Sequence, residues 1–141
     1  MSAATAPQFI HLSVHSEYSL VDGLIRIDEL VERTAQLGMP AVALTDVCNF
    51  FALVHFYQAA EARGLKPICG AEFSVLAAED TAQARLTLLV QNEAGYRNLT
   101  RLISRAYLEG QVRGRPVLRR AWLTDAAEGL IALSGFRQIR R

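Results

Sequence analysis

The decapeptide LGMPAVALTD, residues 37–46, decides the fold class. Gly38 and Pro40 predict the end of a preceding helix, because glycine accommodates the backbone of a helix terminus and proline cannot continue a helix. Residues 41–45 are then almost wholly apolar, which is typical of a short strand covered on both faces. The decapeptide therefore indicates a helix-to-strand connection of the kind found in α/β proteins.

The segments on both sides of this decapeptide alternate in type. Residues 26–37 carry apolar side chains at helical spacing, with Ile27, Leu30 and Val31 on one face. Alternation of helices and strands predicts an α/β fold with a mainly parallel sheet and right-handed crossovers. The pattern predicts strands at 9–14, 41–45, 67–76, 86–90 and 130–133, helices at 26–37, 50–63 and 93–108 (the last capped by Asn92), a loop at 110–116 and a short helical stretch around Trp122.

The length of 141 residues suits one ordinary domain. A closed barrel of alternating strands and helices needs roughly 200 residues or more, so four or five strands favour a fragment of a larger barrel. We expect residues 1–8, which are small and polar, to form a disordered leader, and residues 9–141 to be one truncated unit. No secretory signal and no apolar run of about 20 residues is present, which favours a cytoplasmic protein without membrane contact.

Charge is divided unevenly along the chain. Residues 1–96 hold 5 Lys and Arg against 11 acids, whereas residues 97–141 hold 10 Arg against 3 acids. One interpretation is a surface for single-stranded DNA or a partner at Arg113, Arg115, Arg119 and Arg120. The other is a solvated face that neutralises the acidic half of the chain. Two isolated cysteines are expected to be reduced and buried (Cys48 and Cys69).

Candidate ligands for a divalent metal follow three predicted strands. His15 and Asp22 come after the first, Asp46 after the second, and Glu72 lies in the third. Functional sites of parallel α/β folds gather at the carboxyl ends of strands, and His, Asp and Glu are metal ligands. Asp46 suits a helix N-cap at least as well as a metal ligand or a base.

The histidine spacing weakens this metal hypothesis. His11 and His15 are four residues apart, about 13 Å in a strand at about 3.3 Å per residue, too far to share one ion unless the strand bends. A His-x-His pair would suit a metal, but Ser13 stands at its second position. The lone His55 is expected to be a packed or surface residue. The residues therefore indicate part of a metal site.

Four segments, in order, carry a family resemblance. They are FIHLSVHSEYSLVDG (9–23), LGMPAVALTD (37–46), KPICGAEF (66–73) and LTLLVQNEAGYRNL (86–99). They resemble the opening of the PHP (polymerase and histidinol phosphatase) domain of bacterial replicative DNA polymerases, the DNA polymerase III α subunits. The resemblance covers about residues 9 to 135.

The resemblance implies a distorted (β/α)7 barrel whose His, Asp, Glu and Cys side chains hold up to three metal ions, in a site similar to metal-dependent phosphoesterases. This chain departs from that pattern at Ser13, Val47 and Arg85, which stand where histidines are expected. A fixed cation at Arg85 repels a divalent ion, and we expect it to pair with Asp22 or Glu72 instead. The resemblance therefore implies a degenerate metal site that binds no metal.

The expected function follows from the resemblance. The parent is a DNA-directed DNA polymerase that uses Mg²⁺ at carboxylates beyond residue 141, while this part is a non-catalytic scaffold for the polymerase chain and a docking module for the proofreading exonuclease subunit. DNA contact is then made through the parent protein. Two alternatives are a metal-dependent phosphoesterase (proofreading or pyrophosphatase) using His15, Asp22, Glu72 and Asp46, and single-stranded DNA contact through residues 113–120.

Overall fold

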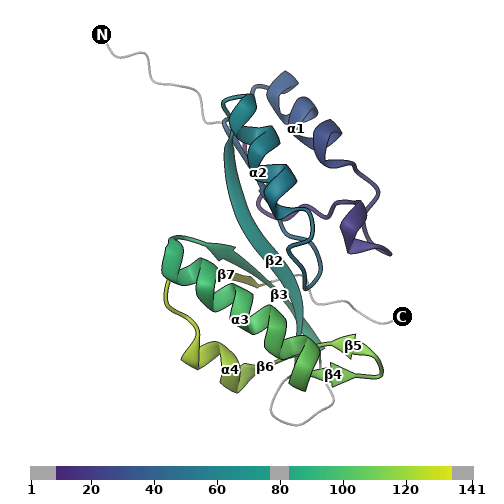
Figure 1. Cartoon of the computed structure of the whole chain (residues 1–141), viewed down its shortest axis with the longest axis vertical. Helices are drawn as coiled ribbons and strands as arrows, with labels where there is room; N and C mark the ends of the chain where they lie inside the picture. Colours follow the sequence, from purple (N-terminus) through teal and green to yellow (C-terminus); the bar gives the residue numbers. More distant parts are fainter. Residues whose placement is uncertain (1–8, 77–82, 135–141) are drawn as a thin grey trace.

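The computed structural model describes residues 9–76 and 83–134 (Figure 1). The expected leader at residues 1–8 lies outside these ranges. In chain order the elements are η1 (Glu17–Ser19), α1 (Ile27–Gln36), β1 (Ala41–Leu44), α2 (Leu53–Ala62), β2 (Lys66–Leu76), β3 (Gln83–Val90), α3 (Glu93–Glu109), β4 (Gln111–Val112), β5 (Arg115–Pro116), β6 (Leu118–Arg119), α4 (Arg120–Asp125) and β7 (Leu130–Ser134).

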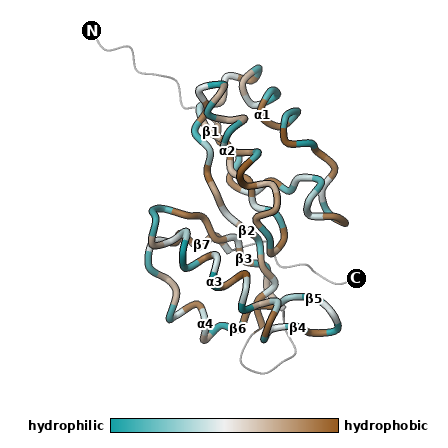
Figure 2. The backbone as a smooth tube through the Cα atoms, in the orientation of Figure 1, coloured by the Kyte–Doolittle hydropathy of each residue, from teal (hydrophilic) through white to brown (hydrophobic). Residues whose placement is uncertain are grey.

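The predicted helices are confirmed to within a few residues at their ends. The Asn92 side chain caps α3 by accepting a hydrogen bond from the Gly95 amide at 3.0 Å, which satisfies one of the free amides of the first turn. Figure 2 shows hydropathy alternating along α1 and α3, as expected of amphipathic helices. No helix in the described part of the chain is long and apolar enough to cross a membrane.

Two local predictions are wrong. Residues 9–14 form no strand, although the carbonyls of His11 and Val14 accept hydrogen bonds from β1 and its end. The Val14 amide donates to the Thr45 hydroxyl at 2.9 Å, so a side chain replaces the ladder partner and the strand pattern stops. The predicted loop at 110–116 contains the β4–β5 hairpin, whose two turn residues, Arg113 and Gly114, have the positive φ angles that tight hairpins need.

The α/β class is confirmed, with a mixed sheet of order β1-β2-β3-β7 and β6 paired to the end of β2. The expected parallel arrangement holds where β2 pairs with β1 and β6, whereas β3 lies antiparallel to β2 and β7. Only six residues connect β2 to β3, and a parallel crossover needs a dozen or more. In the residues described the sheet is open, so the expected barrel is not closed here.

Two hydrophobic clusters form the core, and β2 runs between them (Figure 1). The first lies among α1, α2 and β1 and includes Val31, Val42 and Phe56. The second lies between α3, α4 and the β2–β3 hairpin and includes Phe73 and Leu99. Because the eleven residues of β2 pair with β1 at one end and with β3 at the other, this strand connects the parts of the sheet that the two clusters cover.

Candidate functional site

The strand register brings Glu72 and Arg85 to the same face of the sheet. Glu72 pairs with Thr87 in the β2–β3 ladder, and Arg85 lies two residues along β3 on the same side, a diagonal distance that long side chains span. Ala71 and Phe73 point to the opposite face, into the cluster under α3, because side chains alternate along a strand. The candidate site therefore lies on the sheet face away from α3.

Four side chains meet on this face in a chain of ion pairs. One carboxylate oxygen of Glu72 lies 3.2 Å from Nε2 of His15, and the other accepts a hydrogen bond from Arg85 at 2.9 Å. The second guanidinium nitrogen of Arg85 lies 3.4 Å from the Asp22 carboxylate. The expected pairing of Arg85 is thus confirmed with both acidic partners. We call these four residues the charged cluster.

Glu72 and His15 shift each other's protonation. The hydrogen bond to Glu72 raises the pKa of His15; burial opposes this rise but does not cancel it. Burial by itself raises the pKa of Glu72, but the hydrogen bond and charge of His15, helped by Arg85, bring the net pKa below its ordinary value. The pair is therefore biased towards an ionised Glu72 beside a protonated His15.

Asp46 lies in a separate hydrogen-bonded cage close to the charged cluster. Its carboxylate accepts hydrogen bonds from the Ser16 amide, the Ser16 hydroxyl and the Ser19 hydroxyl, each at 2.7 Å. All three residues are buried, and Asp46 is only 2% exposed. Since α2 begins at Leu53, Asp46 caps no helix there. Its contacts fasten the loop after His15 to the end of β1.

The sequence interpretation did not predict this serine cage of Ser16 and Ser19 around Asp46. Ser19 also accepts a hydrogen bond from the Val47 amide at 3.1 Å, so its hydroxyl is fully engaged. The available signal was two serines three residues apart, followed by Gly23. A Cβ at Gly23 would come within 1.9 Å of the Ser16 carbonyl oxygen, so the loop closes only around glycine.

The oxygens of this region do not form a metal-binding set. The charged cluster engages Glu72 and Asp22 with a guanidinium, and the serine cage engages both oxygens of Asp46. Across residues 9–76 and 83–134, no group of three or more His, Cys, Asp and Glu side chains is arranged to hold an ion. As arranged here, the described residues therefore do not fit the metal centre that the resemblance implies.

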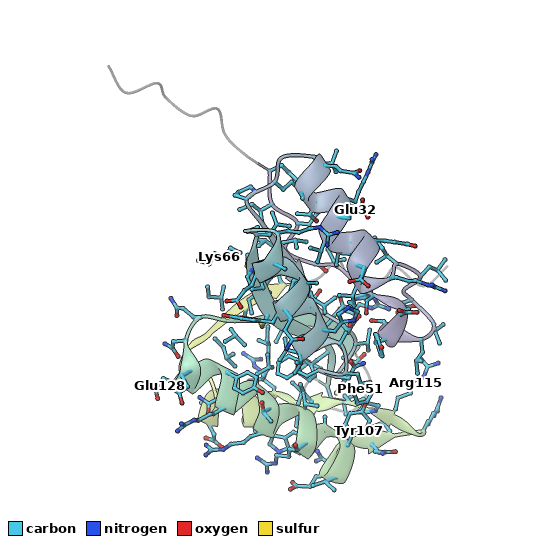
Figure 3. The ribbon with its side chains drawn as sticks, turned by 45° about the horizontal axis from the view of Figure 1, so that its top comes forward. Glu32, Phe51, Lys66, Tyr107, Arg115 and Glu128 are labelled. Atoms are coloured by element: carbon cyan, nitrogen blue, oxygen red, sulfur yellow. The ribbon has the colours of Figure 1, made fainter. Side chains whose placement is uncertain are left out.

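The arginines of the second half lie far along the chain from these groups. Arg113 lies in the β4–β5 turn, Arg115 directly follows the turn, and Arg119 and Arg120 stand at the start of α4; all four are exposed. Figure 3 shows Arg115 at the periphery of the molecule. The guanidinium of Arg119 lies 5.9 Å from the ring centroid of Trp122, within cation–π range. The four side chains are therefore exposed at two places, the β4–β5 hairpin and the start of α4.

The remaining predicted residues take structural positions. His55 lies at the surface, 3.0 Å from the Asp28 carboxylate, as expected. Cys48 is buried and Cys69 is half-buried, and both are free thiols. Burial raises the pKa of Cys48 to about 12, so its thiol stays protonated at neutral pH.

Comparison with known proteins gives one family and a consistent set of relatives. The family model of the PHP domain matches residues 11–139. DNA polymerase III subunit alpha of Vibrio cholerae is 52% identical over 130 residues, and that of Escherichia coli is 48% identical over 134 residues. These alignments cover 92% and 93% of this chain but 11% of each relative. The chain thus spans about a ninth of the curated relatives it matches.

Two solved structures share the fold. One is a Bifidobacterium adolescentis protein named as a candidate metal-dependent phosphoesterase, with a TM-score of 0.55, 18% identity, and coverage of 71% of this chain and 34% of that chain. The other is an amidohydrolase from Chromobacterium violaceum with bound sulfate and no metal, with a TM-score of 0.55, 26% identity, and coverage of 69% and 32%. Both matches support the α/β arrangement described above.

Proposed function

This chain belongs to the PHP domain family, and from that premise we propose that it is the N-terminal portion of the PHP domain of a bacterial DNA polymerase III α subunit. The parent is then a cytoplasmic DNA-directed DNA polymerase that uses Mg²⁺, and this portion is a scaffold with a degenerate metal site. The observation that carries the degenerate site is Arg85, whose guanidinium bonds both Glu72 and Asp22.

The electrostatic reason is simple. A divalent cation needs oxygens or imidazoles that are free of other cations, and a guanidinium cannot give up its proton at neutral pH. Displacing Arg85 from Glu72 would break a 2.9 Å charge-assisted hydrogen bond to a largely buried carboxylate. The presence of Arg85 in place of a histidine also weakens the phosphoesterase alternative, because that chemistry needs an ion to activate water.

Calorimetric titration with Zn²⁺ and Mn²⁺ tests this proposal. We expect the wild-type chain to bind neither ion more tightly than about millimolar. The matched variant restores the three expected ligands (Ser13→His, Val47→His and Arg85→His) and should bind Zn²⁺ at least about a hundredfold more tightly. Micromolar binding by the wild type, lost in both His15→Ala and Glu72→Ala, would contradict a degenerate site.

The scaffold also offers a surface that fits exonuclease-subunit docking. Between α2 and α3 lies an apolar groove of about 730 Å³, lined by Val54, Tyr57 and Tyr96 over a floor of Cys69 and Val90. Two acidic side chains, Glu61 and Glu93, stand among its lining residues. This chemistry suits a peptide segment of the exonuclease subunit with large apolar anchors and flanking basic residues.

A binding measurement with the exonuclease subunit tests this docking surface. Val54 is 69% exposed, so Val54→Glu should leave the fold intact while placing a charge in the groove. We expect at least about tenfold weaker binding, equivalent to roughly 1.4 kcal/mol. Leu108→Glu is the matched control, because Leu108 is 83% exposed and does not line the groove. Equal affinity for both variants would remove the groove from the proposal.

A second candidate function is contact with single-stranded DNA, favoured by the four exposed arginines at 113–120. Phosphate contacts release counterions, so affinity would fall steeply with salt. We expect the double variant Arg119→Ala and Arg120→Ala to weaken binding to an oligonucleotide and to flatten its salt dependence. The Arg97→Ala variant, at a position paired with Glu93, is the control.

A further inference from the structure

The loop of residues 18–24 exposes an unusual amount of apolar surface. Leu20 is 82% exposed, and Val21 and Leu24 are each 93% exposed. Among the residues that the structure describes, only one other large hydrophobic side chain, Leu108 at 83%, is exposed to this degree. Scattered exposed leucines are ordinary, but three within five residues form a patch that indicates an interaction site. We call residues 18–24 the apolar loop.

The apolar loop is held in place by hydrogen bonds from several elements. The Asp46 cage fixes its beginning through Ser19, and the Asn49 side chain donates to the Tyr18 carbonyl at 3.0 Å. Arg85 holds Asp22 near its end. The Glu17 amide donates to the Ile25 carbonyl at 3.0 Å and closes the loop at its base. The exposed side chains are therefore carried on a fixed support.

The backbone at Leu20, one of the exposed residues of the apolar loop, is strained. Its φ of 60° and ψ of −68° describe the rare form of the γ-turn, and the Val21 amide donates to the Ser19 carbonyl at 2.8 Å, two residues back. A leucine seldom adopts positive φ, because its Cβ crowds the following carbonyl. Strain of this kind persists where the surroundings impose it, and it gathers at functional contacts.

The course of the chain identifies the occupant. Strand β7 ends at Ser134, which pairs with Leu86, the neighbour of Arg85. Arg85 in turn binds Asp22 in the apolar loop, so the end of β7 and this loop are connected through Arg85. The matching polymerase subunits are about nine times longer than their aligned region. A segment on the same polypeptide has a high effective concentration at this surface.

We propose that the apolar loop is the contact through which this portion of the domain seats the part of the polymerase polypeptide that follows it, which covers Leu20, Val21 and Leu24 with an apolar surface. This inference rests on the proposed function and gives its scaffold role a specific location. Asp46 and Arg85 then have a defined task, because they hold the loop in its docked shape before the partner arrives.

The test uses the full-length polymerase polypeptide. Serine at positions 20, 21 and 24 (Leu20→Ser, Val21→Ser and Leu24→Ser) should lower its first thermal transition by at least about 4 °C, because covered apolar surface is lost. The matched control, Leu37→Ser with Leu108→Ser, removes two exposed leucines elsewhere and should shift it far less. Equal shifts in the two proteins would overturn the proposal.

Hydroxyl-radical footprinting of the wild-type polypeptide gives an independent reading. Relative to the urea-unfolded protein, we expect strong protection of Leu20, Val21 and Leu24 in the polymerase polypeptide alone. Protection that appears only after the exonuclease subunit is added, or only as protein concentration rises, would overturn the proposal in favour of a separate subunit or a second copy. Absence of protection would overturn it too. None of these footprinting outcomes affects the metal titration, which tests the degenerate site separately.

Discussion

Asp46, just after β1, and Glu72, in the neighbouring strand β2, are two buried carboxylates that the chain holds in opposite ways. Asp46, at 2% exposure, accepts hydrogen bonds from uncharged serine donors alone. Glu72, at 9% exposure, lies between the imidazole of His15 and the guanidinium of Arg85. Their backbones are hydrogen-bonded to each other, with the Glu72 amide donating to the Asp46 carbonyl at 3.1 Å.

The difference teaches how the two carboxylates contribute to one scaffold. The donors of Asp46 carry no charge and are themselves buried, so this contact fixes geometry and depends on complete hydrogen bonding. The donors of Glu72 are cations at the edge of solvent, so this contact responds to pH and salt. Losing Asp46 should therefore damage the fold, whereas losing partners of Glu72 should tune it.

The largest effect is expected for Asp46→Ala. The substitution leaves the Ser16 amide and the two serine hydroxyls without their acceptor, and each unsatisfied buried group costs about 1–3 kcal/mol. We expect a loss of about 3 kcal/mol or more in the free energy of unfolding, measured by urea denaturation. The matched control is Asp28→Ala, whose side chain is 70% exposed, with a change within about 0.5 kcal/mol. A loss below about 1 kcal/mol for Asp46→Ala would contradict the cage.

Glu72→Gln should have the next largest effect. The amide keeps the shape of the side chain but leaves His15 and Arg85 without their shared anion, and hydrogen bonds to charged groups contribute about 1.5–3 kcal/mol. We expect a loss within that range at pH 5.5 in the same denaturation experiment. Glu93→Gln, at a carboxylate that is 75% exposed and paired with Arg97, serves as control. Similar losses for both variants would show that the burial of Glu72 does not strengthen its contribution to the free energy of unfolding.

The effect of Glu72→Gln should depend on pH in a defined direction. The pKa of His15 is raised above 6.5, so its contribution is complete below pH 6.5 and disappears as pH rises through the folded value. The pKa of Glu72 is lowered below 4.5, so its contribution is complete above pH 4.5 and disappears as pH falls through the folded value. The difference in unfolding free energy between wild type and variant should therefore be largest between pH 4.5 and 6.5. A difference that stays flat up to pH 9 would refute this pairing.

Much of the architecture could be predicted because its causes are local. Helical periodicity predicted α1 and α3, Asn92 indicated the start of α3, and an apolar run indicated β1. The pairing of Arg85 with nearby acids was also predictable, because a fixed cation among carboxylates needs partners. The antiparallel pairing of β2 with β3 follows from their short connection, and the length of that connection is known only once the ends of both strands are known.

The serine cage could not be predicted, because its contacts join distant parts of the chain. Ser16 and Asp46 are 30 residues apart, and no local pattern states that one will bond the other. For the same reason residues 9–14 resembled a strand: their β-prone side chains were visible, but the Thr45 hydroxyl that takes the Val14 amide was not. Local composition describes what a segment prefers, and long-range polar contacts decide what it becomes.

Arg85→Ala should have the smallest effect of the three substitutions and the strongest salt dependence. The side chain of Arg85 is 39% exposed and that of Asp22 is 42% exposed, so solvent screens their 3.4 Å contact. The substitution also leaves the contact between Glu72 and His15 in place. Exposed ion pairs contribute about 0.2–1 kcal/mol, and we expect a loss of about 1 kcal/mol or less. Because the Debye length falls from about 10 Å at 0.1 M salt to about 3 Å at 1 M, this loss should shrink as salt is added. The Asp46→Ala loss, made of contacts with uncharged donors, should change little over the same salt range. If the Arg85→Ala loss matched that of Glu72→Gln and ignored salt, Arg85 would be a buried structural residue like the serines, and the contrast between the two carboxylates would fail.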